Sequence, residues 1–377
     1  MTARWYHNHE YAKNTWSGSY LAASIQNQLL DNTSWKQRFV DAYAGEITDL
    51  PSANIAAART YADRGMASVG SPEWLAARRA SVASPTVFNP EGVIGAKLAE
   101  NSAFWQADLV YDFNNQLPKD GWKILVGANF RRYTVDSDGA FFNDNRLVPN
   151  SLVGAHIGYK DNIHLAESGL FGQVGNKFFE DRLQLSFVGR FNHHTNFKLN
   201  FTPQIAAVFT PDVSRKHHFR TSFTTGVRNP GIQEQYINFL ISPNHVILGG
   251  TMDNLDNYYD PFLDLTGTEL QAVLKEQLGY DHQGLRPERN STLEVGYKTL
   301  LVKGKLLMDV NAYGSQYLNF VERANLTITG GDGQPKIHAL YANLSDKVTA
   351  YGVGANVEYV FQKYYKLYAM TKTGACI

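Results

Sequence analysis

Thiols are almost absent from this chain. Cys376 is the only cysteine among 377 residues, so no disulfide can form within the chain and no metal cluster can be built from thiolates. The cysteine content therefore gives no indication of the cellular compartment.

Long apolar runs and an excess of charge are missing as well. No stretch approaches the roughly 20 consecutive apolar residues of a transmembrane helix, which excludes a helical membrane protein. Lysine and arginine total 35, as do aspartate and glutamate, so no net positive charge is present to attract nucleic-acid phosphates. We expect no nucleic-acid partner.

Catalytic signatures are also missing. The sequence has neither a phosphate-binding Walker loop nor the Gly-x-Ser-x-Gly elbow of a hydrolase. We therefore expect no enzyme and no cofactor. Any energised step would draw on another protein.

Aromatic residues, in contrast, are abundant. With 21 tyrosines and 21 phenylalanines, the aromatic content is 13%, and tyrosine suits a position that is apolar at one end and wet at the other. Such a composition is typical of membrane barrels with aromatic girdles, of interfaces and of carbohydrate-binding surfaces.

The clearest pattern is an alternation of apolar and polar residues. In FRTSFTTGVR, residues 219–228, the two kinds alternate, and successive side chains of a strand point to opposite faces. Similar segments occupy residues 105–113, 122–131, 293–298, 306–313 and 351–359. Their length is roughly that of a tilted strand crossing a bilayer.

The connections between these segments alternate between short and long, with a medium link after Phe191. Outer-membrane barrels have short periplasmic turns and longer extracellular loops. Counting a strand at residues 16–28, we expect about twelve strands in an all-β, antiparallel transmembrane β-barrel. Short connections lie near 114–121, 179–181, 211–216 and 301–304, and long ones lie near 29–101, after Tyr133, near 229–286 and after Phe320.

Helical segments are predicted inside the long loops. Ser71 supplies an N-cap, Pro72 a first helical residue and Glu73 a first-turn acid, while Gly65 is a candidate to end an upstream helix. The expected helices lie in SWKQRFVDAYAGEI, PSANIAAARTYADRG, WLAARRASVA and GTELQAVLKEQLGY.

Two strand motifs resemble a known family. FRTSFTTGVRNPGIQEQY is similar to the Arg-x-Ser-x-x-x-Gly-x-Arg-x-Pro signature of TonB-dependent outer-membrane receptors. LRPERNSTLEVGYK resembles their strand with a Pro-Glu pair followed by Glu-x-Gly-x-Lys. NFRRYTVDSDGAFFND and FTPQIAAVF look like the Bacteroidota-type version of the barrel, and the resemblance runs from about Ala103 to Tyr359.

This resemblance implies a 22-stranded barrel with an N-terminal plug, placed in the outer membrane of a Gram-negative bacterium. It implies uptake of a scarce nutrient, such as a siderophore, a vitamin conjugate or a glycan, with energy from the TonB complex. Residues 1–377 would then be part of the barrel domain, with the plug and the C-terminal closing strands outside the chain. The implied partners are the TonB complex through the plug, membrane lipid and a surface lipoprotein.

The alternation places a set of charged and amide side chains toward the lumen. A lysine or arginine on the lipid face would cost about 2–4 kcal/mol at the bilayer midplane. In the lumen, these side chains would pair with one another or with the plug; ligand binding is the alternative. The set comprises Arg220, Arg228, Glu294, Asp309 and Asn311.

A second candidate site is the loop TMDNLDNYYDPFLD, which combines acids with aromatics. These residues could hold a sugar or a cation, or form a solvated loop; their spacing matches no calcium loop. The candidates are Asp253, Asp256, Tyr258, Tyr259 and Asp260. The histidines at 7, 9, 193–194 and 217–218 lack metal-ligand spacing, so we expect no metal site.

Two other functions share parts of this pattern. A passive porin or structural outer-membrane barrel would show the same alternation without a plug. A soluble carbohydrate-binding or carbohydrate-hydrolysing β protein would use the aromatics as sugar platforms, but hydrolysis needs paired inward carboxylates, and the alternation offers no obvious pair.

Overall fold

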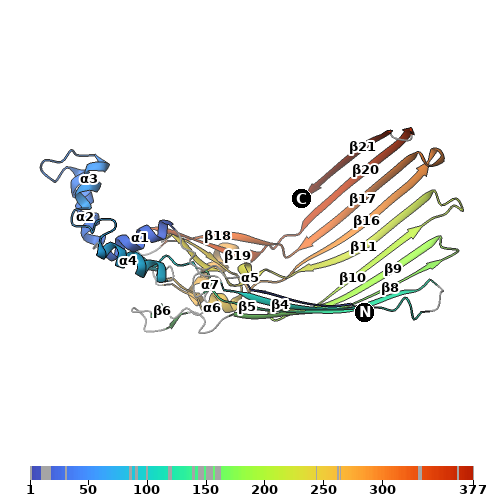
Figure 1. Cartoon of the computed structure of the whole chain (residues 1–377), viewed down its shortest axis with the longest axis horizontal. Helices are drawn as coiled ribbons and strands as arrows, with labels where there is room; N and C mark the ends of the chain where they lie inside the picture. The colour runs from blue at the N-terminus through green and yellow to red at the C-terminus, as the bar shows by residue number, and fades with distance from the viewer. Residues whose placement is uncertain are drawn as a thin grey trace.

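The computed structural model describes residues 2–9, 18–29, 32–84, 87–89, 92–98, 101–117, 121–137, 141–142, 148–149, 156–157, 163–242, 244–260, 263, 265–329, 333–362 and 365–376. Its largest element is an antiparallel sheet of eleven strands, open between its first and last strands (Figure 1). In sheet order these are β1 (Thr2–His9), β4 (Ala103–Asp112), β5 (Lys123–Val135), β8 (Ile163–Phe178), β9 (Leu183–His194), β10 (Phe197–Phe209), β11 (His217–Arg228), β16 (Glu288–Leu301), β17 (Leu306–Leu318), β20 (Val348–Gln362) and β21 (Tyr365–Cys376).

The connections of this sheet follow the predicted alternation with one exception. Short turns, such as the one through η1 (Val302–Gly304), lie at one end of the sheet, and the long loops lie at the other, which we call the loop end (Figure 1). The exception is the link between β9 and β10, which lies at the loop end and consists only of Thr195 and Asn196. It is shorter than predicted because β9 continues past Phe191 to His194.

The strand predicted at residues 16–28 is wrong. The described part of this segment belongs to the helix α1 (Gly18–Leu29). Leu21 and Ile25, four residues apart, pack against Ala77 and Ala96, and this spacing fits one face of a helix. In the described part of the chain the large sheet has eleven strands, which agrees with the predicted number of about twelve.

The four predicted helices are present, as α2 (Asn32–Ala44), α3 (Ile55–Ala62), α4 (Pro72–Ala83) and α7 (Gly267–Leu278). Ser71 caps α4 by accepting a hydrogen bond from the Trp74 amide at 3.2 Å. In contrast to the prediction for Gly65, α3 ends at the cap residue Asp63. Among the described residues, none of the helices combines the length and the hydropathy needed to span a membrane.

Helices α1 to α4 form a helical arm within the connection from β1 to β4. Ala42 of α2 is buried, as are Ala58 and Ala62 of α3. The buried side chains between these two helices are therefore small. Helices α2 and α3 lie farthest from the sheet (Figure 1). The described residues also contain three two-stranded antiparallel sheets: β2 (Val87–Asn89) with β3 (Gly92–Ile94), β6 (Val148–Pro149) with β7 (His156–Ile157), and β14 (Tyr259–Asp260) with β15 (Leu265–Thr266).

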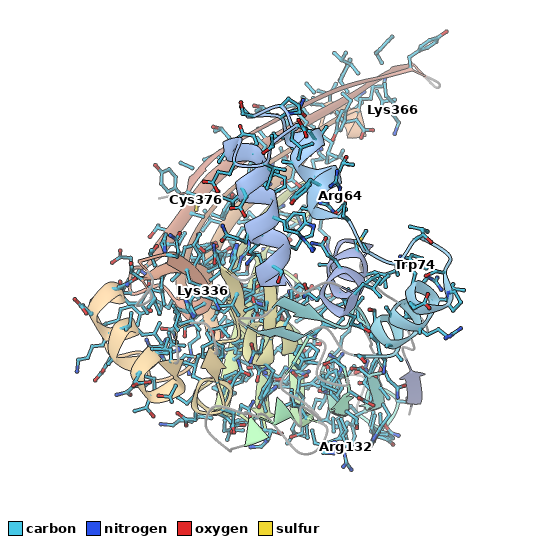
Figure 2. The ribbon with its side chains drawn as sticks, turned by 90° about the vertical axis from the view of Figure 1, so that its left-hand side faces the viewer. Arg64, Trp74, Arg132, Lys336, Lys366 and Cys376 are labelled. Carbon is cyan, nitrogen blue, oxygen red and sulfur yellow. The ribbon has the colours of Figure 1, made fainter. Side chains whose placement is uncertain are left out.

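Two long loops, from β11 to β16 and from β17 to β20, fold together into a unit that we call the loop subdomain. Its sheet has the order β12 (Asn238–Ser242), β13 (His245–Leu248), β19 (Pro335–Asn343) and β18 (Val321–Thr329). The two loops meet where β13 pairs in parallel with β19. The remaining helices are α5 (Ile232–Tyr236) and α6 (Met252–Asp256). Figure 2, which looks at the molecule from the loop end, shows buried Lys336 of β19 apart from Trp74 on the helical arm.

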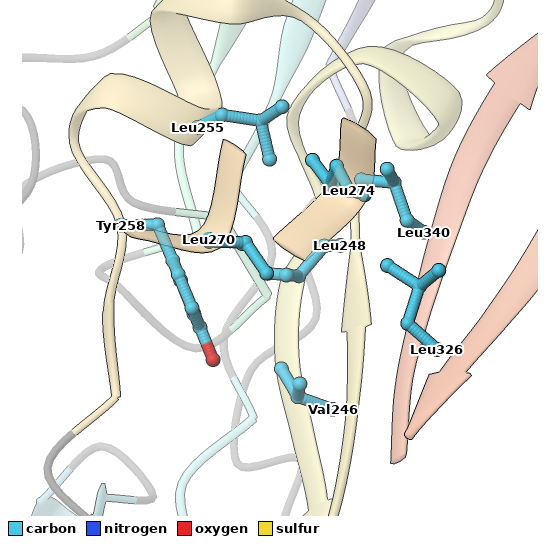
Figure 3. Packing of buried hydrophobic residues seen from close by; sticks show 8 residues of the cluster. All are labelled: Val246, Leu248, Leu255, Tyr258, Leu270, Leu274, Leu326 and Leu340. Atoms are coloured by element: carbon cyan, nitrogen blue, oxygen red, sulfur yellow. The ribbon is translucent and has the colours of Figure 1, made fainter. Parts of the chain in front are cut away.

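The loop subdomain has a hydrophobic core of its own. Helix α7 contributes Leu270 and Leu274, and both side chains are fully buried. The core consists of Val246, Leu248, Leu255, Tyr258, Leu270, Leu274, Leu326 and Leu340 (Figure 3). The sequence predicted helix α7 in this region, but not the sheet that it covers.

A second apolar cluster joins the loop subdomain to the wall of the large sheet. Tyr236 and Ile237, at the end of α5, pack with Val135 of β5 and with Ile163 and Leu165 of β8. Burial raises the pKa of the Tyr236 phenol, whose oxygen accepts a hydrogen bond from Asn196 at 2.6 Å. The loop subdomain is therefore packed against one face of the large sheet at its loop end.

Candidate functional site

The two faces of the large sheet differ in chemistry. Phe223 of β11 and Leu293 of β16 are register partners on one face, with 42% and 54% of their surface exposed. Ser222 and Glu294, also register partners, lie on the other face. We call the face with Phe223 the outer face and the face with Glu294 the inner face. The outer face presents further exposed apolar side chains, including Leu109, Phe130, Leu170, Phe187, Phe201, Ile205, Phe219, Val295 and Val353.

The two sequence motifs interlock on the inner face. Arg220 of the first motif is the register partner of Gly296 of the second. A Cβ at residue 296 would lie 2.6 Å from Arg220 Nε, so the glycine leaves the space in which the arginine crosses its neighbouring strand. Arg220 then reaches Asp309 of β17 at 2.8 Å and Glu294 at 3.7 Å. The spacing within both motifs is thus explained by pairing between strands.

Arg228 joins the sheet to the loop subdomain. Its guanidinium donates to Glu288, the register partner on β16, at 2.6 and 2.7 Å, and to Glu234 of α5 at 2.9 and 3.1 Å. Glu288 also accepts a hydrogen bond from the amide of Val321, which begins β18. One arginine therefore holds the bases of both loops, and we call this group the arginine clamp.

The structure brings four of the five lumen candidates into two groups. Arg220, Glu294 and Asp309 form an ion-pair network, while Arg228 lies in the arginine clamp. Asn311 lies on the same inner face, next to its register partner Gly354 of β20. A Cβ added at residue 354 would lie 2.8 Å from the amide oxygen of Asn311. These side chains are thus largely occupied with one another.

A pocket of about 510 Å³ lies on the inner face beneath the loop subdomain. It is formed by β4, β5, β8 and β9, which bring together residues far apart in the sequence, such as Asp108 and Arg190. The lining residues are Asp108, Val110, Ala128, Asn129, Arg131, Glu167, Phe171 and Arg190. The sequence indicates the polar face of β4 and β5 but not this pocket. Register pairs such as Arg131 with Glu167 could not be known from a single strand.

The acidic loop candidates do not form a single surface. Asp253 and Asp256 are exposed on α6, and Asp256 accepts a hydrogen bond from Gln271 at 2.7 Å. Tyr258 is 4% exposed and belongs to the core of the loop subdomain, where its hydroxyl lies 3.1 Å from His338 Nε2. The burial of Tyr258 argues against its role as a ligand contact.

Two of the five loop candidates, Tyr259 and Asp260, form β14. Their side chains lie outside the described part of the structure.

The paired histidines are separated by the alternation of the strands. His217 Nδ1 lies 2.7 Å from the hydroxyl of Tyr297, whereas His218 Nδ1 lies 3.0 Å from Thr210 Oγ1. His194 Nε2 is 3.8 Å from Glu167. Within the described ranges, no three histidine, cysteine, aspartate or glutamate side chains gather in a way that could hold a metal ion.

Comparison with solved structures gives matches at low sequence identity. The siderophore receptor PirA from Pseudomonas aeruginosa is 12% identical, with 74% of this chain and 44% of that chain covered and a TM-score of 0.47. A variant of the ferric enterobactin receptor PfeA from Pseudomonas aeruginosa is 12% identical, with 76% and 37% covered and a TM-score of 0.51. The chain thus spans less than half the length of these receptors.

Comparison with sequences gives one family. No curated protein matches the chain. The family described as "TonB dependent receptor-like, beta-barrel" matches residues 2–375, which is nearly the whole chain and includes both motifs and the inner-face groups described above. The chain belongs to the TonB-dependent receptor-like β-barrel family.

Proposed function

We propose that this chain forms part of the barrel of an outer-membrane receptor that takes up a scarce nutrient with energy from the TonB complex. The observation that carries this proposal is the sheet with an apolar outer face and a polar inner face, covered at its loop end by a folded subdomain. Apolar side chains on the outer face suit lipid, and the polar inner face suits a water-filled lumen.

The loop subdomain favours a receptor over the alternative of a passive porin. A porin keeps an aqueous channel through its barrel, whereas here two loops share a buried core and pack against the inner side of the wall. Such a unit presents folded surfaces to an incoming ligand. In this proposal the protein is a transporter and not an enzyme.

The finer parts of the proposal concern partners and cargo. The barrel would take its energy through a plug domain that contacts TonB, and its outer face would contact outer-membrane lipid. Its cargo would be a siderophore, a vitamin conjugate or a glycan, and Asp253 and Asp256 are the exposed loop candidates for contacting it. A surface lipoprotein partner and the Bacteroidota-type assignment stay predictions.

Uptake in cells tests this proposal. The gene that encodes this chain would be expressed in a Gram-negative host with and without a functional TonB complex, and radiolabelled ferric siderophores, cobalamin and oligosaccharides would be supplied at nanomolar concentration. We expect uptake of one class only when TonB is functional. Equal uptake in both hosts would identify a passive pore and overturn the proposal.

A further inference from the structure

The outer face of the large sheet ends in apolar side chains where the short turns lie. Phe178 of β8 and Leu183 of β9 are register partners there, and Leu183 in turn pairs with Phe209 of β10. Phe209 pairs with Phe219 of β11. The three phenylalanines are exposed, so an apolar layer crosses the outer face at this end.

The same face ends in basic side chains at the loop end. On β5, Phe130 is followed two residues later by Arg132, and on β9, Phe191 is followed by His193. Residues two apart lie on the same face of a strand. Arg132 lies at the rim of the molecule in the view from the loop end (Figure 2). The exposed basic side chains that follow the apolar run on β5, β8, β9 and β10, which we call the basic belt, are Arg132, His164, His193 and Lys198.

An irregularity in strand pairing gives Lys198 its place in the belt. The register of β9 with β10 shifts between Phe197 and Asn200, so that Lys198 and Leu199 both lie opposite His193. Phe197 is buried against the loop subdomain, and Asn200 is buried as well, whereas Lys198 and Leu199 are exposed. Lys198 therefore lies on the outer side, next to His193.

The belt is not balanced by acids on its own face. Among the described residues of β4, β5, β8, β9 and β10, the acids are Asp108, Asp112 and Glu167. The register places all three on the inner face, because Asp108 pairs with Asn129 and Asp112 with Leu125, while Glu167 pairs with Arg131. The outer face of these strands is therefore basic at the loop end and uncharged along its apolar run.

The parts of the receptor expected outside this chain would leave the belt uncovered. In the receptor that we propose, the plug would lie on the inner side, and further strands would join the open edges of the sheet at β1 and β21. The belt lies on the outer face of strands between β4 and β11, away from both edges. Its exposure on that face therefore does not depend on the plug or on additional strands.

We propose that the basic belt binds the phosphate groups of an anionic lipid in the membrane leaflet at the loop end. Charged side chains on the lipid face of a barrel are tolerated near the interface and not at the midplane, which puts the belt at the level of the headgroups. Basic clusters attract anionic lipid headgroups, and a guanidinium can donate two parallel hydrogen bonds to one phosphate.

The width of the belt favours a headgroup with more than one phosphate. Four adjacent strands are separated by three intervals of about 4.8 Å, so the belt extends over roughly 14 Å. One phosphate contacts only part of this width. The apolar layer of Phe178, Leu183 and Phe209 at the opposite end offers no such group of bases. This inference rests on the proposed contact of the outer face with lipid and does not depend on TonB or on the cargo.

Competition between three lipids tests the proposal. The 377-residue chain, refolded in micelles of a zwitterionic detergent, would receive equal amounts of diphosphoryl lipid A, monophosphoryl lipid A and phosphatidylcholine. The two lipid A forms share their acyl chains and differ in one phosphate. Native mass spectrometry would count the lipids retained by the chain. We expect diphosphoryl lipid A to be retained roughly tenfold more than phosphatidylcholine, with the monophosphoryl form between them.

Variants of the belt locate the binding. Arg132→Gln should reduce the preference for diphosphoryl lipid A by about threefold or more, and Arg132→Lys, which keeps the charge, should retain most of it. The double variant His193→Gln, Lys198→Gln should weaken the preference as well. Lys303→Gln is the matched control, because Lys303 is exposed in the turn η1 at the opposite end of the sheet; it should leave the preference unchanged. Far-UV circular dichroism would show that each variant keeps its strand content.

Three results would overturn the proposal. One is equal retention of the three lipids by the folded chain. Another is the same loss in Arg132→Gln and Lys303→Gln, because it would reflect the general charge of the protein. The third is displacement of lipid A by millimolar inorganic phosphate, which would indicate a site for a free anion and not for a lipid.

These results are distinguishable from failure of the proposed function. Retention of phosphatidylcholine without any preference would refute the basic belt and would leave the outer face in contact with lipid. Absence of all three lipids from the folded chain would overturn both the belt and the proposed lipid contact. The uptake proposal has its own test in the TonB requirement in cells.

Discussion

The large sheet and the loop subdomain use the same apolar side chains in opposite ways. In the sheet, residues such as Phe223 and Leu293 lie exposed on the outer face, whereas Leu270 and Leu340 of the loop subdomain are fully buried. Apolar surface is stable wherever water is excluded, whether by lipid or by other side chains. One chain is therefore adapted to two solvents, and burial alone is no guide to which residues stabilise it.

Truncation of a buried leucine should separate the two regions most clearly. Leu340→Ala should destabilise the loop subdomain by about 2–5 kcal/mol, because it leaves a cavity in a closed core. Hydrogen exchange of the loop-subdomain amides, followed by mass spectrometry, measures this loss. Leu293→Ala on the outer face is the matched control and should change the exchange of these amides little. Equal effects of both variants would contradict the comparison.

Introduction of a charge should distinguish the two faces of one strand. Phe223→Arg should destabilise the folded sheet in lipid vesicles by about 2–4 kcal/mol, because the charge would face the hydrocarbon region. Ser222→Arg, one residue away, would place the same group beside Glu294 on the inner face and should cost far less. Denaturant titration in lipid vesicles measures both variants, and a larger loss for Ser222→Arg would reverse our assignment of the faces.

Removal of the arginine clamp should loosen the connection between the two regions. Arg228→Gln leaves Glu234 and Glu288 without their shared cation. We expect the contact between the loop subdomain and the sheet to lose about 1–2 kcal/mol of stability. Charged hydrogen bonds are strong, but Arg228 is half exposed, which reduces their contribution. Faster hydrogen exchange in α5 and at the start of β18 would report it. Arg59→Gln, which breaks an exposed pair within the helical arm, should leave these amides unchanged. The clamp has no such role if both variants behave alike.

Acidification should affect the loop subdomain through His282. Burial lowers the pKa of this imidazole below its ordinary 6.5, although its hydrogen bond with the Gly250 carbonyl opposes the shift, and nearby Arg286 adds to it. The unfolded chain then binds the proton at a higher pH than the folded chain. Stability should therefore be fully present above pH 6.5 and should fall as the pH drops through the window below it.

Hydrogen exchange of the loop-subdomain amides between pH 7.5 and 5, corrected for the intrinsic exchange rate, measures this effect. His282→Gln should flatten the profile. An unchanged dependence in the variant would assign the effect to other groups.

Much of the sheet could be predicted because its information is local. The segment from Phe219 to Arg228 shows both its extended conformation and its two faces, since side chains alternate along a strand. The helix α4 was equally predictable from Ser71 and Pro72. Residues 16–28 were misread because a short segment with scattered apolar residues fits both the period of a strand and that of a helix. Only the packing of Leu21 and Ile25 against α4 and Ala96 selects the helix.

The pocket and the loop subdomain could not be predicted in this way. The pocket depends on the register of four strands, and the core of the loop subdomain depends on two loops that meet through β13 and β19. Tyr258 illustrates the consequence: among neighbouring acids it reads as a surface residue, and in the fold it is buried beside His338.

By itself, the sequence indicated the family, most strands of the wall, four helices of the loops, and the division of these strands into an apolar and a polar face. These properties follow from periodicity and from side-chain spacing within single segments. Only the tertiary structure decided which charged groups pair with one another, as for Arg220 with Asp309 and Arg228 with Glu288. The reason is that a charge is neutralised by its neighbours in space, and these neighbours come from strands whose register no single segment records.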